Sequence, residues 1–248
     1  LALSKADPAS AQARRDLSVS YERLGDVSLQ LGDARAARDA YQQALDIALA
    51  LSKADPASAQ ARRDLSVSYE RLGDVSLQLG DARAARDAYQ QALDIALALS
   101  KADPHSAQAR RDLSVSYNKL GDVSLELGDA RAARAAYQKA LEIALALSKA
   151  DPTSAQARRD LAASYSKLGD VSLELGDARA ARAAYQQALD LRLALSKADP
   201  ASAQARRDLS VSYERLGDVS LQLGDARAAR DAYQQALDIA LALSKADP

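Results

Sequence analysis

Apolar positions recur along this chain at intervals of three and four residues, which is the spacing of one face of an α-helix. Two such stripes follow one another before the pattern starts again. The first stripe runs through Ala13, Leu17, Tyr21, Leu24, Ser28 and Leu31, and the second through Ala37, Tyr41, Ala44, Ala48 and Leu51. The pattern predicts two consecutive helices of about 22 to 24 residues each. Val19 and Val27 lie off the first stripe, which indicates a second, partly buried face that packs on a neighbouring helix.

The residues between the stripes predict where each helix begins and ends. Asp7 is expected to cap the first helix, with Pro8 at its first position, where the missing N–H of proline costs nothing. Gly32 suits the left-handed conformation that ends a helix, and Asp33 is expected to cap the second helix. The second helix is expected to stop at Asp55, where the pattern restarts.

The segment from Leu24 to Leu45 returns, nearly unchanged, every 48 residues. A fixed period of this size is typical of stacked repeat arrays. We therefore predict an all-α fold, an α-solenoid of antiparallel helix pairs that forms a single repeat domain over residues 1–248. The predicted repeats are 7–54, 55–102, 103–150, 151–198 and 199–246, with 1–6 as the end of a preceding second helix and 247–248 as the start of a next copy.

The composition excludes several classes of function. The 33 basic and 34 acidic residues nearly cancel, so the chain has no overall charge that favours nucleic acid. No apolar run reaches the roughly 18 residues that a membrane span needs. With no cysteine, disulfides and thiolate metal sites are excluded. No signal peptide is visible, so a cytoplasmic location is the default expectation, although Leu1 lies inside a repeat and the native N-terminus can be missing.

Candidate catalytic chemistry is scarce. His105 is the single histidine, it is expected in the first turn of a helix, and the other four copies lack it. Paired-carboxylate catalysis needs two carboxylates in different environments, which identical copies do not offer. We therefore expect no enzyme activity, no cofactor and no metal site. Asp26 is interpreted either as a solvated residue or as part of an inner acidic strip. The repeated Arg14 and Arg15 are expected to pair with Asp16 or with acidic residues of an adjacent helix, rather than to form a nucleic-acid track.

The conserved positions of each copy resemble the tetratricopeptide repeat. The motif is Tyr21-x-x-Leu24-Gly25-x-x-Ser28, then Gly32-Asp33, then Ala37-x-x-x-Tyr41-x-x-Ala44-Leu45. The resemblance covers all five copies and implies a right-handed superhelix with a concave groove, with Gly25 at the close helix crossing and Tyr21 and Tyr41 in the core. Two features depart from the family. Ser28 stands where a large residue is usual, and the unit carries 14 residues beyond the family's 34, which are expected to lengthen both helices by about two turns.

Copies one, two and five are identical, and copies three and four carry all the differences. Recent duplication and deliberate construction both account for such identity. The differing positions include those of Ala9 (His105, Thr153), Glu22 (Asn118, Ser166), Arg23 (Lys119, Lys167), Gln30 (Glu126, Glu174), Asp39 (Ala135, Ala183) and Ala48 (Arg192). Nearly all are polar exchanges off the apolar stripes, so these positions are expected to face solvent.

The resemblance implies a scaffold that binds a protein or peptide in the groove lined by the first helix of each pair. Carried over by position, the lining includes Val19 and Leu29 together with three polar positions per copy. These candidate groove residues are Glu22, Asp26, Gln30, Glu70, Asp74, Gln78, Asn118, Asp122, Glu126, Ser166, Asp170, Glu174, Glu214, Asp218 and Gln222. The family's carboxylate clamp uses Lys and Asn where this chain has Glu22 and Asp26, so a basic or polar peptide is the expected ligand.

A second hypothesis is a structural module that associates end to end. Solenoids usually end in capping repeats with a polar outer face, but the fifth copy is identical to the first two. An uncapped stripe would be open to another chain and would give head-to-tail stacking. The residues expected to make this contact are Ala229, Tyr233, Ala236, Ala240 and Leu243.

Overall fold

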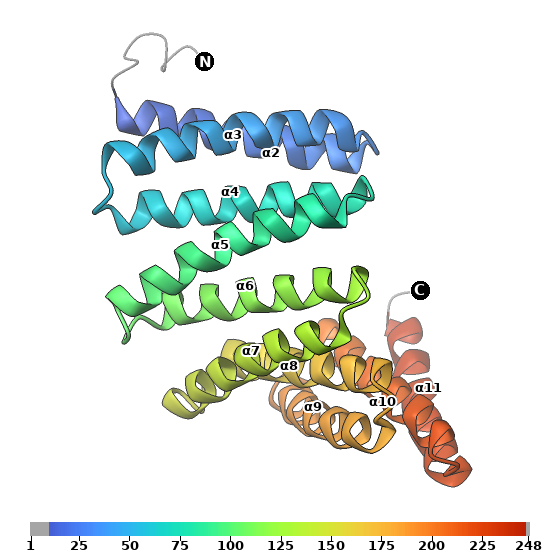
Figure 1. Cartoon of the computed structure of the whole chain (residues 1–248). Helices are drawn as coiled ribbons and strands as arrows, with labels where there is room; N and C mark the ends of the chain where they lie inside the picture. The colour runs from blue at the N-terminus through green and yellow to red at the C-terminus, as the bar shows by residue number, and fades with distance from the viewer. Residues whose placement is uncertain (1–9, 247–248) are drawn as a thin grey trace. The chain divides into compact units, whose positions relative to one another are not determined.

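A computed structural model describes residues 10–246, and this part of the chain consists of ten helices joined by short turns, without a strand (Figure 1). The predicted helix end at 1–6, the predicted cap at Asp7 and the predicted start of a next copy at 247–248 lie outside these residues. The helices are α2 (Ala11–Gln30), α3 (Ala34–Ala54), α4 (Ala59–Gln78), α5 (Ala82–Ala102), α6 (Ala107–Glu126), α7 (Ala130–Ala150), α8 (Ala155–Glu174), α9 (Ala178–Ala198), α10 (Ala203–Gln222) and α11 (Ala226–Ala246).

The helices form two units. The first unit contains α2 to α6 and the second contains α7 to α11. Within each unit every helix packs against the next one along the chain (Figure 1). Equivalent helices begin 48 residues apart, at Ala11, Ala59, Ala107, Ala155 and Ala203. The chain is therefore an all-α helical repeat solenoid, which confirms the predicted fold class.

The turn inside each helix pair follows the sequence prediction. Gly32 has a φ of +80°, the left-handed region that a side chain would strain. The Asp33 carboxylate accepts a hydrogen bond of 2.9 Å from the backbone N–H of Ala36. Asp33 thus caps α3 as predicted, and the same turn recurs at Gly80 and Asp81.

The turn between pairs differs from the prediction. Asp55 does not cap the following helix, because its carboxylate accepts from the N–H groups of Ala57 and Ser58 within the turn. Ser58 is the cap, since its hydroxyl accepts from Ala61 N–H at 3.1 Å. The first helices therefore have 20 residues and the second helices 21, fewer than predicted. For the same reason His105 lies in the turn, exposed, and not in the first turn of a helix.

Small residues on the second helix of each pair allow close packing in the core. Ala37 and Tyr41 of α3 are buried against Val75 of α4, which confirms the predicted second face at the position of Val27, whereas Val19 and its equivalent Val67 are exposed. The position of Tyr21 is less buried than expected: Tyr69 is only partly buried against the cluster that contains Leu65. Ser28, where the family carries a large residue, is buried and donates its hydroxyl proton to the Leu24 carbonyl at 2.9 Å.

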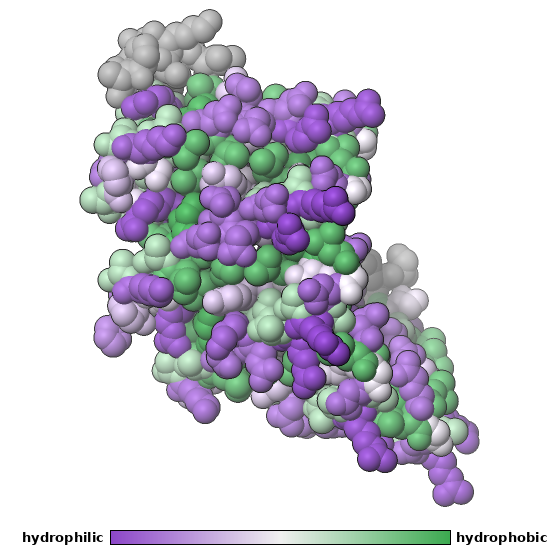
Figure 2. Space-filling view, in the orientation of Figure 1, coloured by the Kyte–Doolittle hydropathy of each residue, from purple (hydrophilic) through white to green (hydrophobic). Residues whose placement is uncertain are grey.

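The surface mixes hydrophilic and apolar residues, as Figure 2 shows for one side of the molecule. Within residues 10–246, no helix combines the length and the hydropathy that crossing a membrane requires.

Candidate functional site

The first helices of successive pairs form a face that carries the predicted groove residues; α2, α4 and α6 form it in the first unit, and α8 and α10 in the second. We call it the first-helix face. One of the three predicted positions is open to solvent in every copy. This is the position of Gln30, and its equivalents are Gln78, Glu126, Glu174 and Gln222.

The Asp26 position is occupied by an internal interaction. The Asp26 carboxylate accepts a hydrogen bond of 2.7 Å from the Tyr41 hydroxyl and lies 3.2 Å from the guanidinium of Arg71 on the next first helix. Burial, together with this hydrogen bond, raises the pKa of the Tyr41 hydroxyl. Asp26 therefore ties three helices together, and is neither simply solvated nor simply a strip residue.

The same arrangement recurs with a lysine or an arginine as the cation. Asp74 accepts from the Tyr89 hydroxyl at 2.5 Å and from the Lys119 ammonium at 2.6 Å. In the second unit Asp170 accepts from Tyr185 and from Arg215. Asp74, Gln78 and Asp122 also line a cavity of about 390 Å³ between α2, α4 and α6. In the last copy Asp218 is exposed and accepts from Tyr233 at 2.6 Å.

The Glu22 position behaves differently from the Asp26 position. Glu22 is half-buried, and its carboxylate accepts one hydrogen bond, of 3.2 Å, from the Ser68 hydroxyl of α4. Glu70 likewise accepts from Ser116 at 2.9 Å. Burial raises the pKa of both glutamates, and the serine hydroxyl only partly offsets it. These are carboxylates whose charge the protein only partly compensates.

The remaining copies carry other side chains here. Asn118 is half-buried and its side-chain oxygen has no hydrogen-bond partner within the described residues. Ser166 is buried and donates to the Ala162 carbonyl. Glu214 is exposed.

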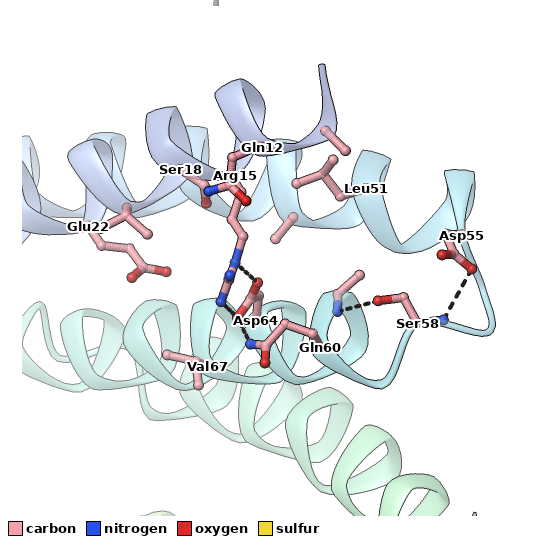
Figure 3. A pocket seen from close by; sticks show the side chains of 14 residues that line it. Gln12, Arg15, Ser18, Glu22, Leu51, Asp55, Ser58, Gln60, Asp64 and Val67 are labelled. Atoms are coloured by element: carbon pink, nitrogen blue, oxygen red, sulfur yellow. Dashed lines mark hydrogen bonds and ion pairs between the residues drawn. The ribbon is translucent and has the colours of Figure 1, made fainter. Parts of the chain in front are cut away.

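Glu22 lies in a pocket of about 310 Å³ between α2 and α4, which we call the α2–α4 pocket. Figure 3 shows its polar side chains reaching toward one another from the two helices. Its apolar wall is formed by Val19, Ala48, Leu51 and Val67. Its charged residues are one arginine, Arg15, and three carboxylates, Glu22, Asp55 and Asp64. The pocket therefore combines an apolar wall with an excess of negative charge.

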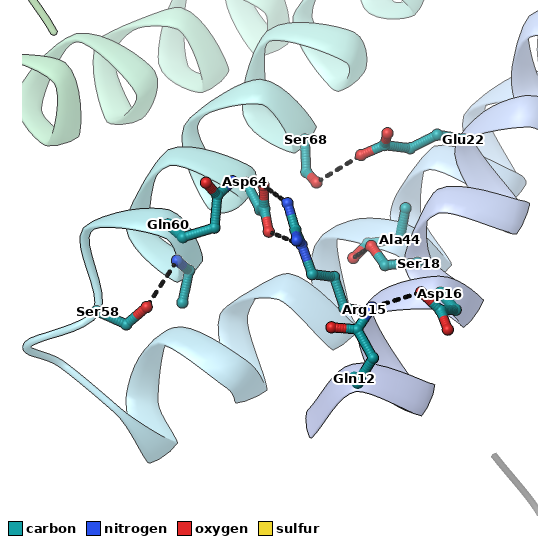
Figure 4. A network of polar contacts seen from close by, with 11 residues as sticks. Gln12, Arg15, Asp16, Ser18, Glu22, Ala44, Ser58, Gln60, Asp64 and Ser68 are labelled. Atoms are coloured by element: carbon teal, nitrogen blue, oxygen red, sulfur yellow. Dashed lines mark hydrogen bonds and ion pairs between the residues drawn. The ribbon is translucent and has the colours of Figure 1, made fainter. Parts of the chain in front are cut away.

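Arg15 does not compensate the charge of Glu22, because its guanidinium is already paired with Asp64. Its guanidinium makes two contacts with the Asp64 carboxylate, at 2.7 and 3.3 Å, across the two first helices (Figure 4). Arg63 and Asp112 repeat this pair between α4 and α6. The second arginine of the doublet therefore pairs with an acidic residue of the adjacent repeat, as predicted, whereas the Nε of Arg14 and of Arg62 is buried without a hydrogen-bond partner within the described residues.

Equivalent pockets lie between the next first helices. The α4–α6 pocket, of about 60 Å³, contains Arg63, Glu70 and Asp112. The α8–α10 pocket, of about 510 Å³, contains Arg158, Arg159 and Arg192 together with Asp160, Asp199 and Asp208.

Models of known families match most of the chain. The tetratricopeptide repeat matches at residues 19–50, 67–98 and 115–146, and again over 166–236. The chain belongs to the tetratricopeptide repeat family. The gaps in the match, such as 51–66, contain the end of α3 and the start of α4, where the extra residues were predicted. Proteins of this family generally act as scaffolds for protein–protein interaction.

Solved tetratricopeptide-like structures share the fold. BtubC (BKLC) from P. vanneervenii is 23% identical with a TM-score of 0.76, over 99% of this chain and 87% of that one. Nearly identical TPR-like repeats of a Podosopora anserina protein described as a kinesin light chain are 15% identical with a TM-score of 0.69, over 94% and 98%. A Rap protein complexed with Competence and Sporulation Factor is 15% identical with a TM-score of 0.62, over 95% and 56%. No curated protein matches the sequence.

One prediction about the tetratricopeptide copies is wrong. Several varied positions do not simply face solvent: Asn118 is half-buried and Ser166 buried at the position of Glu22, and Arg192 is half-buried where Ala48 is almost fully covered. Both positions lie at the pockets. Part of the variation between copies therefore changes the side chains of the pockets. The apolar stripes alone did not reveal this burial, because a helix that packs on two neighbours has few positions that are free of contact.

The sequence reasoning also did not place Arg15, Asp64 and Ser68 beside Glu22. A signal for the ion pair was present, because Arg15 and Asp64 are 49 residues apart. Opposite charges separated by about one period lie on equivalent faces of neighbouring repeats.

The residues predicted for end-to-end contact are unevenly exposed. Ala229 and Ala236 are buried, Tyr233 and Leu243 are half-buried, and Ala240 is exposed. The larger apolar surface lies beside them, at Leu221, Leu237 and Leu241. Several of these residues line a shallow pocket of about 350 Å³ on α10 and α11.

Proposed function

We propose that the chain is a non-enzymatic scaffold whose first-helix face binds a peptide segment carrying lysine or arginine. The observation that carries the proposal is the half-buried Glu22 carboxylate in the α2–α4 pocket, next to an apolar wall. A lysine or arginine side chain has the matching form, an apolar stem and a cationic end. The stem would pack on Val19 and Val67 while the cation meets Glu22.

The charges around Glu22 favour a cation. Arg15 is held by Asp64, so it does not compete for Glu22. Arg71 lowers the pKa of Glu22 by its charge, but this effect is smaller than the opposing effect of burial. A ligand cation would therefore supply the positive charge that the protein provides to Glu22 only in part. A second cation of the ligand would do the same for Glu70, one copy further on.

Among similar structures, the Rap protein was solved in complex with Competence and Sporulation Factor. This precedent supports the use of a tetratricopeptide-like array for binding a partner. The chemistry of the partner is argued from the pockets of this chain alone.

Fluorescence anisotropy with two labelled peptides of equal length, one Lys/Arg-rich and one Asp/Glu-rich, tests the proposal. Both peptides are acetylated and amidated, so that their termini carry no charge. We expect the full chain to bind the basic peptide, and the Glu22→Gln, Glu70→Gln double variant to bind it about tenfold more weakly. The matched control is the Asp39→Asn, Asp87→Asn double variant, which removes two exposed carboxylates from second helices. Equal affinity of the wild type and the double variant for the basic peptide would contradict the proposal.

A second candidate function is self-association through the open face of α11. Leu237 is 51% exposed, whereas its equivalents Leu45, Leu93 and Leu189 are 5–6% exposed beneath the next repeat. On the first unit, Val27 is 50% exposed, whereas its equivalent Val75 is fully buried.

Inside the array, Val75 packs on Ala37 and Tyr41. Val27 of a second copy would pack in the same way on Ala229 and Tyr233. The occupant that we propose is therefore the first repeat of another molecule. The dependence of molar mass on concentration tests this candidate.

A further inference from the structure

The fourth copy replaces the carboxylate of the pocket by a guanidinium. At the position of Glu22 it has Ser166, and at the position of Ala48 it has Arg192. Arg192 is half-buried, and its Nη1 donates to the Ser212 hydroxyl at 2.6 Å. Ser212 is equivalent to Ser68, the hydroxyl that contacts Glu22. The same serine position is thus met by a negative charge in the first copy and by a positive charge in the fourth.

This exchange is accompanied by the loss of an ion pair. Arg159 and Asp208 stand at the positions of Arg15 and Asp64, but among residues 10–246 they do not form the pair seen there. In this part of the chain Asp208 keeps only the hydrogen bond from Gln204 on its own helix, at 2.7 Å, which Asp64 also receives from Gln60 in addition to its ion pair. The α8–α10 pocket is larger than the α2–α4 pocket, about 510 against 310 Å³.

The two pockets therefore differ in the charge that they offer. The α2–α4 pocket has one arginine and three carboxylates, and the α8–α10 pocket has three arginines and three carboxylates. In the latter, Arg159 is exposed and is not paired within the described residues, and the guanidinium of Arg192 donates a hydrogen bond to the neutral Ser212. Burial lowers the pKa of Arg192, with Asp208 and Asp170 acting in the opposite direction and Arg215 in the same direction.

We propose that the α8–α10 pocket binds a carboxylate side chain of an acidic peptide, with Arg192 as the main contact and Arg159 as the second. A carboxylate can accept two hydrogen bonds from one guanidinium, which a serine hydroxyl cannot. Arg192 forms no ion pair with Asp208 within the described residues, so the incoming group does not have to displace one. The inference rests on the proposed use of the first-helix face for peptides, and adds that its two units select opposite charges.

Nuclear magnetic resonance of arginine side chains tests this on the unmodified chain. The full chain is labelled with nitrogen-15, and glutarate, as a small dicarboxylate, and the Asp/Glu-rich peptide are titrated separately. We expect both probes to shift the Nε–H signal of Arg192, assigned as the signal that Arg192→Ala removes. No shift of this signal with either probe would overturn the inference. A shift with glutarate alone would support the carboxylate pocket and contradict its use for peptides.

Variants of the full chain separate this site from the proposed basic-peptide site. Arg192→Ala is expected to weaken the Asp/Glu-rich peptide about tenfold, and Lys197→Ala, which removes an exposed charge from the same helix, less than about twofold. The double variant Ser166→Glu, Arg192→Ala places the first copy's residues at these two positions, and is expected to lose the acidic peptide.

All these variants keep Glu22 and Glu70, so binding of the basic peptide should not fall. Unchanged acidic-peptide affinity in both Arg192 variants would overturn the inference, whether or not the basic peptide binds.

Discussion

At the scale of single residues, the two glycines of each copy meet different physical demands. A Cβ on Gly73 would lie less than 3 Å from ring carbons of the buried Tyr89, so this glycine is required by a helix crossing. Gly80 has open space around it but a φ of +79°, so it is required by backbone conformation. The sequence predicted both roles, because seven-residue spacing placed one glycine inside the helix and the other just after it.

Replacing each glycine by alanine distinguishes the two demands. We expect Gly73→Ala to lower the free energy of unfolding by roughly 2–3 kcal/mol, because the ring of Tyr89 must move in a packed core. Gly80→Ala should cost about 1 kcal/mol, the strain of a left-handed alanine. Urea unfolding followed by circular dichroism measures both. The account of the crossing is wrong if Gly73→Ala is the milder change.

The half-buried Glu70 predicts a dependence of stability on pH. Burial raises its pKa in the folded chain, so the folded state binds this proton more tightly than the unfolded state. The contribution of Glu70 to the free energy of unfolding is therefore largest at low pH. It falls as the pH rises from the ordinary glutamate pKa through the raised one. Glu70→Gln removes the penalty and should stabilise the chain at pH 7 by on the order of 0.5 kcal/mol.

The gain from Glu70→Gln should disappear near pH 4, where the wild-type carboxyl is protonated as well. Urea midpoints at pH 4 and pH 7 give the comparison, with the exposed Glu126→Gln as the control. A gain that is the same at both pH values would show that the charge of Glu70 is not its cause.

At the scale of helices, the period and the apolar stripes predicted where the helices run, because these depend on local spacing. The start of the first helices was misplaced, because Asp103 and Ser106 are both good caps and the choice between them depends on the turn. Asp103 accepts from the N–H groups of His105 and Ser106, which leaves Ser106 to cap α6. Contacts between repeats, such as Arg192 with Ser212, were not predicted because they depend on how neighbouring helices face each other.

The carboxylate that joins Tyr89 and Lys119 should contribute to the docking of neighbouring helices. Asp74 receives a hydrogen bond from each of them. Its equivalent Asp218 receives one from Tyr233 and has no cation partner within the described residues. We expect Asp74→Ala to cost roughly 1–3 kcal/mol in urea unfolding and Asp218→Ala less than about 1 kcal/mol. Equal losses would show that the contact with the cation adds nothing to stability.

At the scale of the whole molecule, repetition produces similar pockets, and the few differences between copies give the pockets different charges. Among residues 10–246, it also leaves apolar side chains exposed on α2 and α11. The sequence predicted the position of the first-helix face through the family resemblance. It did not predict which of its residues are occupied by internal contacts, because these depend on how the helices pack: Asp26 meets Tyr41 of its own repeat and Arg71 of the next, whereas Glu22 meets Ser68.

Self-association through α11 should depend on Leu237. We expect the molar mass of the wild type from light scattering to rise with concentration, and Leu237→Glu to remain monomeric, because a charge in a buried apolar contact is costly. Gln235→Glu, which adds a charge at an exposed position of the same helix outside this pocket, is the control. A wild type that is monomeric at millimolar concentration would contradict this function.

The central claim is that Glu22 and Glu70 contact a cationic ligand on the first-helix face. Carboxyl carbon-13 resonances of these two residues, followed against pH with and without the Lys/Arg-rich peptide, test it directly. A ligand that binds the charged form more tightly must lower the pKa of the group, by one unit for each tenfold preference. We predict raised pKa values for both carboxyls in the free chain and a fall in both when the peptide is bound. Unchanged pKa values in the saturated complex would contradict the account.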